Sequence, residues 1–135
     1  MTRYLIDTNH LGEAVGRVSK VRDRIQQMTR RGDVFATCGP VLCELMIGIV
    51  HGANFTATST RLNRLLQAVR LWPINLAFAG YYADVYHELK NGGRVLSQVD
   101  MMLAALARCE CTILLTSIKT SPHFQTSRRK TGSNG

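Results

Sequence analysis

Apolar residues along this chain recur at two different spacings, which predict strands and helices in alternation. Four short apolar runs bounded by turn residues are typical of buried strands, and they cover residues 4–6, 34–37, 71–74 and 112–115. Between them, apolar residues recur every three or four positions, as on the buried face of a helix. The predicted helices cover residues 10–15, 21–28, 39–49, 62–69, 77–89 and 97–106.

This alternation predicts an α/β fold, in which helices cover both faces of a parallel sheet. Pro73 has no N–H to donate, which confines the strand 71–74 to an edge of the sheet or places proline at the strand end. The helix 97–106 is apolar nearly all round, so we expect it to be a buried central helix. Residues 51–59 are polar and predict a connection.

Length and composition indicate a single globular domain. The chain has 135 residues, of which 45% are hydrophobic and 19% charged, as in ordinary globular proteins. Apolar runs stay well below the roughly 18 residues that a membrane span needs, and the start has no signal-peptide pattern. We therefore expect a cytoplasmic protein without a membrane partner.

The net charge of +8 suggests an anionic partner such as nucleic acid. It is unevenly spread, because the last 18 residues contain four basic residues and no acid. Without them, the chain keeps 13 basic and 9 acidic residues, a net charge of +4. Residues 17–31 form a second basic segment, which a solvated surface explains about as well as RNA binding does.

The spacing of the cysteines and histidines predicts no metal site and no catalytic triad. The four cysteines do not form paired C-x-x-C motifs, so we read them as reduced thiols and not as zinc ligands. The four histidines show no ligand or triad spacing, and we read them as surface or satisfied core residues. These eight residues are Cys38, Cys43, Cys109, Cys111, His10, His51, His87 and His123.

Three acids lie next to or within apolar segments that are predicted to be buried, where acidic residues are uncommon. Asp7 directly follows a buried strand, Glu44 lies among apolar residues of a helix, and Asp100 lies in the first turn of the most apolar helix. Sites in open parallel sheets form at the carboxyl ends of the strands, where Asp7 is expected. Helices that follow strands begin at this edge, and the start of the helix with Asp100 is expected there too.

Each acid has a plain structural explanation as well. Asp7 could cap the following helix, Asp100 could form a capping box with Ser97, and Glu44 could simply face water. Taken together, however, clustered carboxylates repel one another unless a divalent cation neutralises them. Oxygen ligands suit Mg²⁺ or Mn²⁺, and Thr8 and Asn9 could position one carboxylate or a water.

Four segments carry a resemblance to the PIN-domain family, and within it to the VapC-like toxin ribonucleases of toxin–antitoxin pairs. They are YLIDTNHL at 4–11, CELMIGI at 43–49, GRVLSQVDMMLAALA at 93–107 and CTILLTS at 111–117. The resemblance implies a three-layer α/β/α sandwich over residues 1–117 and a metal-dependent endoribonuclease. It also implies a cognate antitoxin, a homodimer and a tRNA or ribosomal RNA target.

The resemblance also implies roles for individual residues. Asp7, Glu44 and Asp100 match the acidic residues that bind Mg²⁺ or Mn²⁺ and carry catalysis. Asn9, beside Thr8, matches the supporting polar residue of the D-T-N motif. The hydroxyl residue that ends the last strand is matched by Thr116, with Ser117 next to it.

The end of the chain departs from the family pattern. Many members place another acid or amide where this chain has Ile118, and the expected E-N-W-L-like ending is absent. Back-translated codons, reread one base earlier, permit D-Q-D-F-S-P-L-P-D-V-P-E-E-N-W-L and then a stop across Ser133 and Asn134. We hypothesise that residues from about 117 onward are an out-of-frame product, and expect 118–135 to be a poorly ordered basic tail. A natural tail that binds RNA or aids solubility is the alternative.

Three functions therefore stay open. The leading one is the ribonuclease, whose activity we expect to be weakened by the missing fourth acid. The second is a catalytically inactive PIN-fold module that binds RNA or an antitoxin. A DNA-directed nuclease of the same fold is the third.

Overall fold

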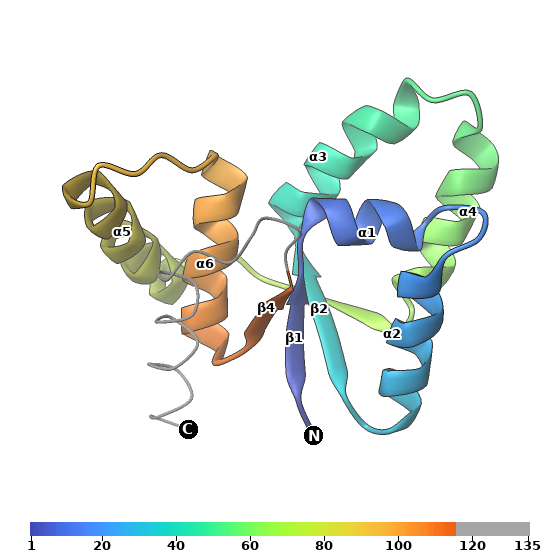
Figure 1. Ribbon diagram of the computed structural model, residues 1–135, viewed down its shortest axis with the longest axis horizontal. Helices are drawn as coiled ribbons and strands as arrows, with labels where there is room; N and C mark the ends of the chain where they lie inside the picture. Colours follow the sequence, from blue (N-terminus) through green and yellow to red (C-terminus); the bar gives the residue numbers. More distant parts are fainter. Residues whose placement is uncertain (116–135) are drawn as a thin grey trace.

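Four parallel strands form one sheet at the centre of the protein, in a computed structural model that describes residues 1–115 (Figure 1). The sheet order is β3-β2-β1-β4, and each neighbouring pair is parallel. The strands are β1 (Arg3–Ile6), β2 (Val34–Cys38), β3 (Val69–Trp72) and β4 (Ile113–Leu115).

Six helices flank this sheet, which gives the predicted three-layer α/β/α arrangement. They are α1 (Thr8–Ala14), α2 (Lys20–Arg30), α3 (Gly39–Val50), α4 (Phe55–Leu65), α5 (Leu76–Asn91) and α6 (Gln98–Glu110). No helix within residues 1–115 is long and apolar enough to cross a membrane. The predicted tail 118–135 lies outside the described residues.

The core lies where the central strands meet the helices. Leu5, Ile6 and Phe35 are almost completely buried, and the ring of Tyr4 stacks on Phe35 across β1 and β2 with 5.0 Å between ring centroids. Each of these large side chains contributes roughly 1.5–3 kcal/mol by its burial. The sheet is therefore anchored at the two strands that lead into α1 and α3.

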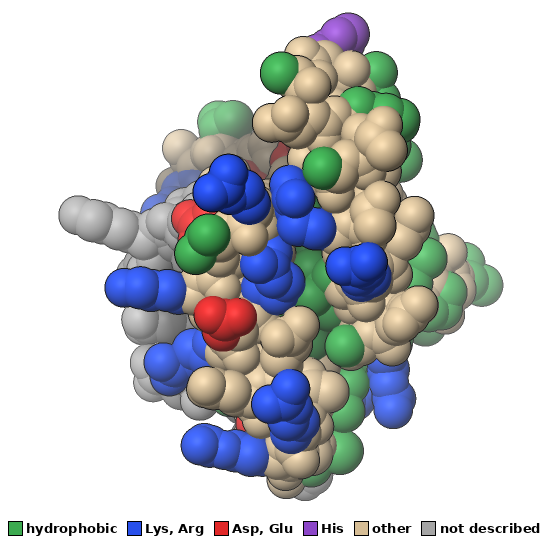
Figure 2. Space-filling model, turned by 90° about the vertical axis from the view of Figure 1, so that its right-hand side faces the viewer, with side chains coloured by type: hydrophobic (Ala, Val, Ile, Leu, Met, Phe, Trp, Pro, Cys, Tyr) green, Lys and Arg blue, Asp and Glu red, His purple; other side chains and the backbone are tan. Residues whose placement is uncertain are grey.

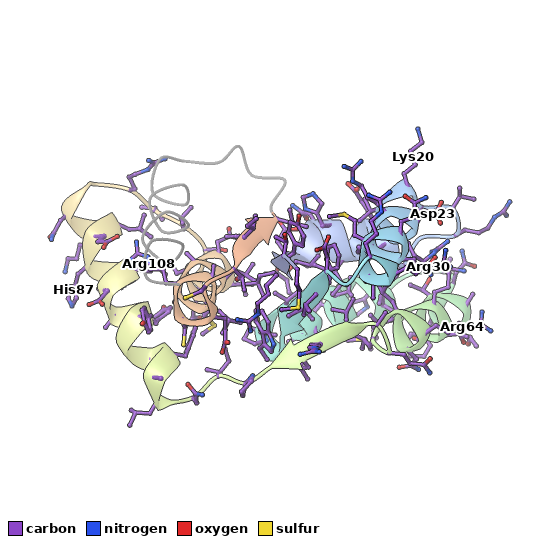
Figure 3. All side chains as sticks on the ribbon, turned by 90° about the horizontal axis from the view of Figure 1, so that it is seen from below. Lys20, Asp23, Arg30, Arg64, His87 and Arg108 are labelled. Carbon is purple, nitrogen blue, oxygen red and sulfur yellow. The ribbon has the colours of Figure 1, made fainter. Side chains whose placement is uncertain are left out.

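Helix α6 is the buried helix that its apolar sequence predicted. All residues from Leu103 to Arg108 are buried, and α6 lies between α5 and β4 (Figures 1 and 3). The buried Arg108 donates to both carboxylate oxygens of Glu88 on α5, one of them at 3.1 Å. This ion pair satisfies a charge that burial would otherwise make costly.

The prediction for the third strand was wrong by two residues. β3 covers Val69–Trp72 and not 71–74, and Val69, assigned to the preceding helix, pairs with Phe35 in the sheet. Its spacing from Leu62 and Leu65 matched a helix, but a β-branched side chain fits equally well in a strand. β3 does lie at the sheet edge, and Pro73 directly follows it.

Helix α4 begins earlier than its sequence suggested. It starts at Phe55, inside the segment 51–59 that we predicted to be a polar connection. Its first turns are rich in threonine and carry no apolar stripe, so they left no helical period to detect. The Thr60 hydroxyl donates to the Thr56 carbonyl at 2.9 Å, which occupies one hydroxyl within the helix.

Candidate functional site

The three candidate acids come from segments that meet at one edge of the sheet. Asp7 follows the end of β1, and Glu44 lies on α3, which begins directly after β2. Asp100 lies in the first turn of α6, which leads back into the parallel strand β4. Because parallel strands end on the same side, the starts of α1, α3 and α6 gather there (Figure 1).

Asp7 is held firmly by the start of α1. Its side chain is 4% exposed, and its Oδ1 accepts the His10 backbone N–H at 2.9 Å. This is the helix cap that the sequence allowed. The Asp7 backbone N–H donates to the Leu115 carbonyl at 3.2 Å, which ties this residue to the end of β4. A capping role and a ligand role are therefore compatible for one carboxylate.

His10 is the residue at this site that sequence reasoning missed. Its Nδ1 lies 2.8 Å from Asp7 Oδ1, and its side chain is 27% exposed. The signal was present, because an acid at a helix cap and a histidine three positions later are neighbours on the first turn. The sequence indicates a surface or core residue, because His10 has no ligand or triad spacing and no serine or cysteine partner nearby. The structure instead pairs it with a carboxylate.

The carboxyl of Asp100 shows that the three acids influence one another. Burial raises its pKa above the ordinary value, a hydrogen bond with the Ser97 side chain lowers it, and the negative charges of Glu44 and Asp7 raise it further. Ser97 also caps α6, accepting the Asp100 backbone N–H at 3.1 Å, as half of the predicted capping box. Asp100 is thus both a first-turn acid and a member of an electrostatic cluster.

Glu44 differs from the other two acids in its exposure. It lies on α3 beside Val41, Leu45 and Ile49, which are buried, while Glu44 itself is exposed. The sequence allowed it to face water, and it does. Its charge is nevertheless close enough to affect the pKa of Asp100. It is therefore the acid of this cluster with the freest access to solvent.

The predicted supporting residues have different environments. The Thr8 hydroxyl is buried and has no hydrogen-bond partner within residues 1–115, although buried hydroxyls are normally paired. Asn9 is exposed. Thr116 and Ser117 lie outside the described residues, so their predicted roles stay predictions.

The donor set fits a hydrated Mg²⁺ or Mn²⁺ ion better than a metal held by many direct ligands. The donors are carboxylate oxygens, which these hard cations prefer. The Thr8 hydroxyl, which has no hydrogen-bond partner within residues 1–115, is a further oxygen next to Asp7 in the sequence. Within residues 1–115, however, no three His, Cys, Asp or Glu side chains are grouped closely enough to hold a metal ion. Mg²⁺ commonly uses one or two carboxylates and keeps several waters, which suits this looser arrangement.

Solved structures share this fold at low sequence identity. VapBC2 from Rickettsia felis, bound to a DNA fragment from its promoter, is 20% identical with a TM-score of 0.76, covering 85% of this chain and 87% of the other. DNA-bound VapBC from Salmonella typhimurium is 17% identical with a TM-score of 0.74, covering 93% and 92%. The FitAcB structure from Neisseria gonorrhoeae is 20% identical with a TM-score of 0.70, covering 92% of each chain.

No curated protein matches the sequence at a significant level. The PIN domain family model, in contrast, matches residues 4–117. This range includes every candidate site residue and nearly all described elements. The chain belongs to the PIN domain family.

Proposed function

We propose that this protein is a metal-dependent endoribonuclease and the toxin of a toxin–antitoxin pair. The observation that carries the proposal is that Asp7, Glu44 and Asp100 come from separate segments to one edge of the sheet. Burial raises the pKa of Asp100 there, and the charges of Glu44 and Asp7 raise it further. Each acid has a local structural explanation, but the repulsion among three carboxylates from separate segments still costs stability. A divalent cation would turn that repulsion into attraction.

Asp7, Glu44 and Asp100 are the residues that would hold Mg²⁺ or Mn²⁺, directly or through water, with Thr8 and Asn9 in support. When bound, such an ion activates water and neutralises charge that develops on a phosphodiester. The chain's own contribution is positioning. The backbone N–H of His10 donates to Asp7 Oδ1, and His10 Nδ1 pairs with the same oxygen, so His10 fixes Asp7. The Ser97 cap fixes the first turn of α6, which carries Asp100.

The partners of this function are part of the proposal. Several structures of the same fold are of VapBC proteins, two of them bound to DNA, which supports an antitoxin as partner. The RNA target would be a tRNA or ribosomal RNA, and the active form a cytoplasmic homodimer. The nuclease domain would extend over residues 1–117, the range that the resemblance suggested.

One observation favours a second function. Because no close group of three metal-binding side chains exists within residues 1–115, the chain could instead be a catalytically inactive module that binds RNA or an antitoxin. The missing acid after the last strand, where Ile118 stands, points in the same direction. Binding without turnover would distinguish this module from the enzyme.

Cleavage of total RNA with added Mg²⁺ or Mn²⁺ tests the proposal, with Asp7→Asn as the matched variant. Asparagine keeps an oxygen that can accept from His10 but loses the charge, so the fold should survive. We expect metal-dependent fragments from the unchanged chain and none from the variant. Equal cleavage by both proteins would refute the site, and the absence of cleavage by the unchanged chain, with RNA binding retained, would favour the module.

A further inference from the structure

We propose that an arginine pocket at the far end of α1 binds a backbone phosphate of the RNA. The pocket has a volume of about 350 Å³. It is separate from the three acids, and nothing in the proposed chemistry uses it. The identity of its ligand, an RNA strand, rests on the proposed function.

Four of the six residues that line this pocket are arginines, and none is acidic. They come from the α1–α2 connection, from α2 and from α4: Arg17, Arg22, Gln26, Arg61, Arg64 and Leu65. Figure 2 views this side of the molecule, where blue Lys and Arg side chains far outnumber red ones. In Figure 3, Arg64 projects from α4 at the same end of the molecule as Lys20 and Arg30 of α2. This surface is thus built for an anion and not only for solubility.

Two of the arginines are fixed in place by the end of α1. Arg22 Nη1 donates to the carbonyls of Ala14, at 2.9 Å, and Gly16. Arg61 Nε donates to the carbonyl of Val15 at 2.7 Å. These carbonyls are at the negative end of the helix, where cations are favoured. Hydrogen bonds to the backbone therefore hold Arg22 and Arg61 in place, and the fold already uses part of their charge.

The charges of the other two arginines are not paired within residues 1–115. Arg17 and Arg64 are exposed, and within residues 1–115 their guanidinium groups make no hydrogen bond and no ion pair. A guanidinium group presents two parallel N–H donors that match the oxygens of a phosphate. An anion in the pocket would therefore find two guanidinium groups, those of Arg17 and Arg64, whose donors are not used within residues 1–115.

One strand of RNA can span the distance between the three acids, which lie near the start of α1, and the arginine pocket at its end. Helix α1 begins at the residue after Asp7 and ends at Ala14, so its seven residues separate the two places by about 10 Å. A phosphate at the acids would leave a phosphate of a nearby nucleotide within reach of the pocket. An acidic protein segment would find the same charges and the same guanidinium donors, but it would also bring apolar side chains to bury, and Leu65 is the only apolar residue among those that line the pocket.

The test compares two double variants with the same net charge. Arg17→Gln with Arg64→Gln removes the free charges of the pocket, whereas Arg24→Gln with Arg30→Gln removes two exposed charges of α2 that do not line it. Both variants keep Arg22 and Arg61 and all basic residues after residue 115. Full-length proteins are titrated, in EDTA so that RNA stays intact, into a fluorescent single-stranded RNA longer than the roughly 4–16 nucleotides of a typical site.

We expect the pocket variant to bind this RNA about tenfold more weakly at low salt, and the control variant to bind almost as well as the unchanged chain. Two lost phosphate contacts should also make the plot of log binding constant against log salt concentration shallower by about 1.4. The difference in RNA affinity between the pocket variant and the unchanged chain should therefore shrink about sevenfold between about 50 and about 200 mM salt. Equal losses in both variants would overturn the proposal, as would the absence of RNA binding. So would a pocket variant that binds RNA normally but loses binding to polyglutamate.

This result is independent of cleavage. Pocket-dependent RNA binding by a chain that cuts no RNA would support the pocket and refute the nuclease. Metal-dependent cleavage by a chain whose RNA affinity does not depend on Arg17 and Arg64 would do the reverse.

Discussion

Asp100→Asn should stabilise the metal-free protein at neutral pH. The substitution keeps the size of the side chain and removes a negative charge that lies partly buried near Glu44 and Asp7. Burial and these two charges raise the pKa of Asp100, so the folded protein holds this proton more tightly than the unfolded chain. The stability that the carboxyl provides is complete below its ordinary pKa of about 3.9, and is lost as the pH rises through the folded-state pKa.

The gain should be small. Interactions between partly exposed charges are typically worth up to about 1 kcal/mol, and loss of an acid from the first turn of α6 costs a part of that. For a chain of this size, we expect a rise in Tm of at most about 4 °C. With a divalent cation bound, the unchanged protein should have the higher Tm, because it should bind the cation better than the variant does. A ligand at 100 times its Kd stabilises the folded protein by about 2.7 kcal/mol.

Thermal unfolding in EDTA and in Mn²⁺ at several pH values measures both effects. Asp84→Asn is the matched control, because Asp84 is exposed on α5. In EDTA at pH 7, Asp100→Asn should raise Tm more than the control, and the difference should shrink toward pH 4. A lower Tm in EDTA at pH 7, or a difference that does not depend on pH, would refute the claim that these carboxylates repel one another.

Three further predictions follow from contacts at the same edge and from the coding sequence. Ser97→Ala should lower the free energy of unfolding by about 1 kcal/mol through loss of the α6 cap, measurable by urea denaturation; an unchanged midpoint would contradict the cap. His10→Leu should weaken Mn²⁺ binding about tenfold or more, whereas His10→Asn, whose side-chain amide can replace Nδ1 as a donor, should bind Mn²⁺ nearly as well as the unchanged chain. If His10→Leu binds Mn²⁺ with the same affinity as the unchanged chain, His10 is not part of the site. Sequencing of the gene should show an acidic, tryptophan-containing ending in the other frame after codon 117, and a frame without that ending would end the hypothesis.

The end of β1 and the start of α6 were predictable because they depend on short-range patterns. Asp7 follows an apolar run and Asp100 opens an apolar helix, and the parallel arrangement of the strands brings these two places together. Glu44 was less certain, since a helix flank that faces water and a helix flank that faces a site look alike in sequence. Only the charge that Asp100 experiences distinguishes them.

Features that depend on contacts between distant segments could not be predicted. Val69 fitted the period of the preceding helix, and its place in β3 is decided by its pairing with Phe35. The arginines of α2 looked like a solvated face, because the pocket also needs Arg61 and Arg64 from α4. Charge along one helix does not show which side chains another helix will bring beside it.

The proposed function depends on Asp7, Glu44 and Asp100 binding one divalent cation together. Isothermal titration of Mn²⁺ into the full-length protein tests it most directly, with Asp7→Asn, Glu44→Gln and Asp100→Asn measured beside the unchanged chain. We expect one Mn²⁺ site in the unchanged protein and at least about tenfold weaker Mn²⁺ binding in each variant. The proposed site is contradicted if the unchanged protein binds no Mn²⁺, or if all three variants bind it with the same affinity as the unchanged protein.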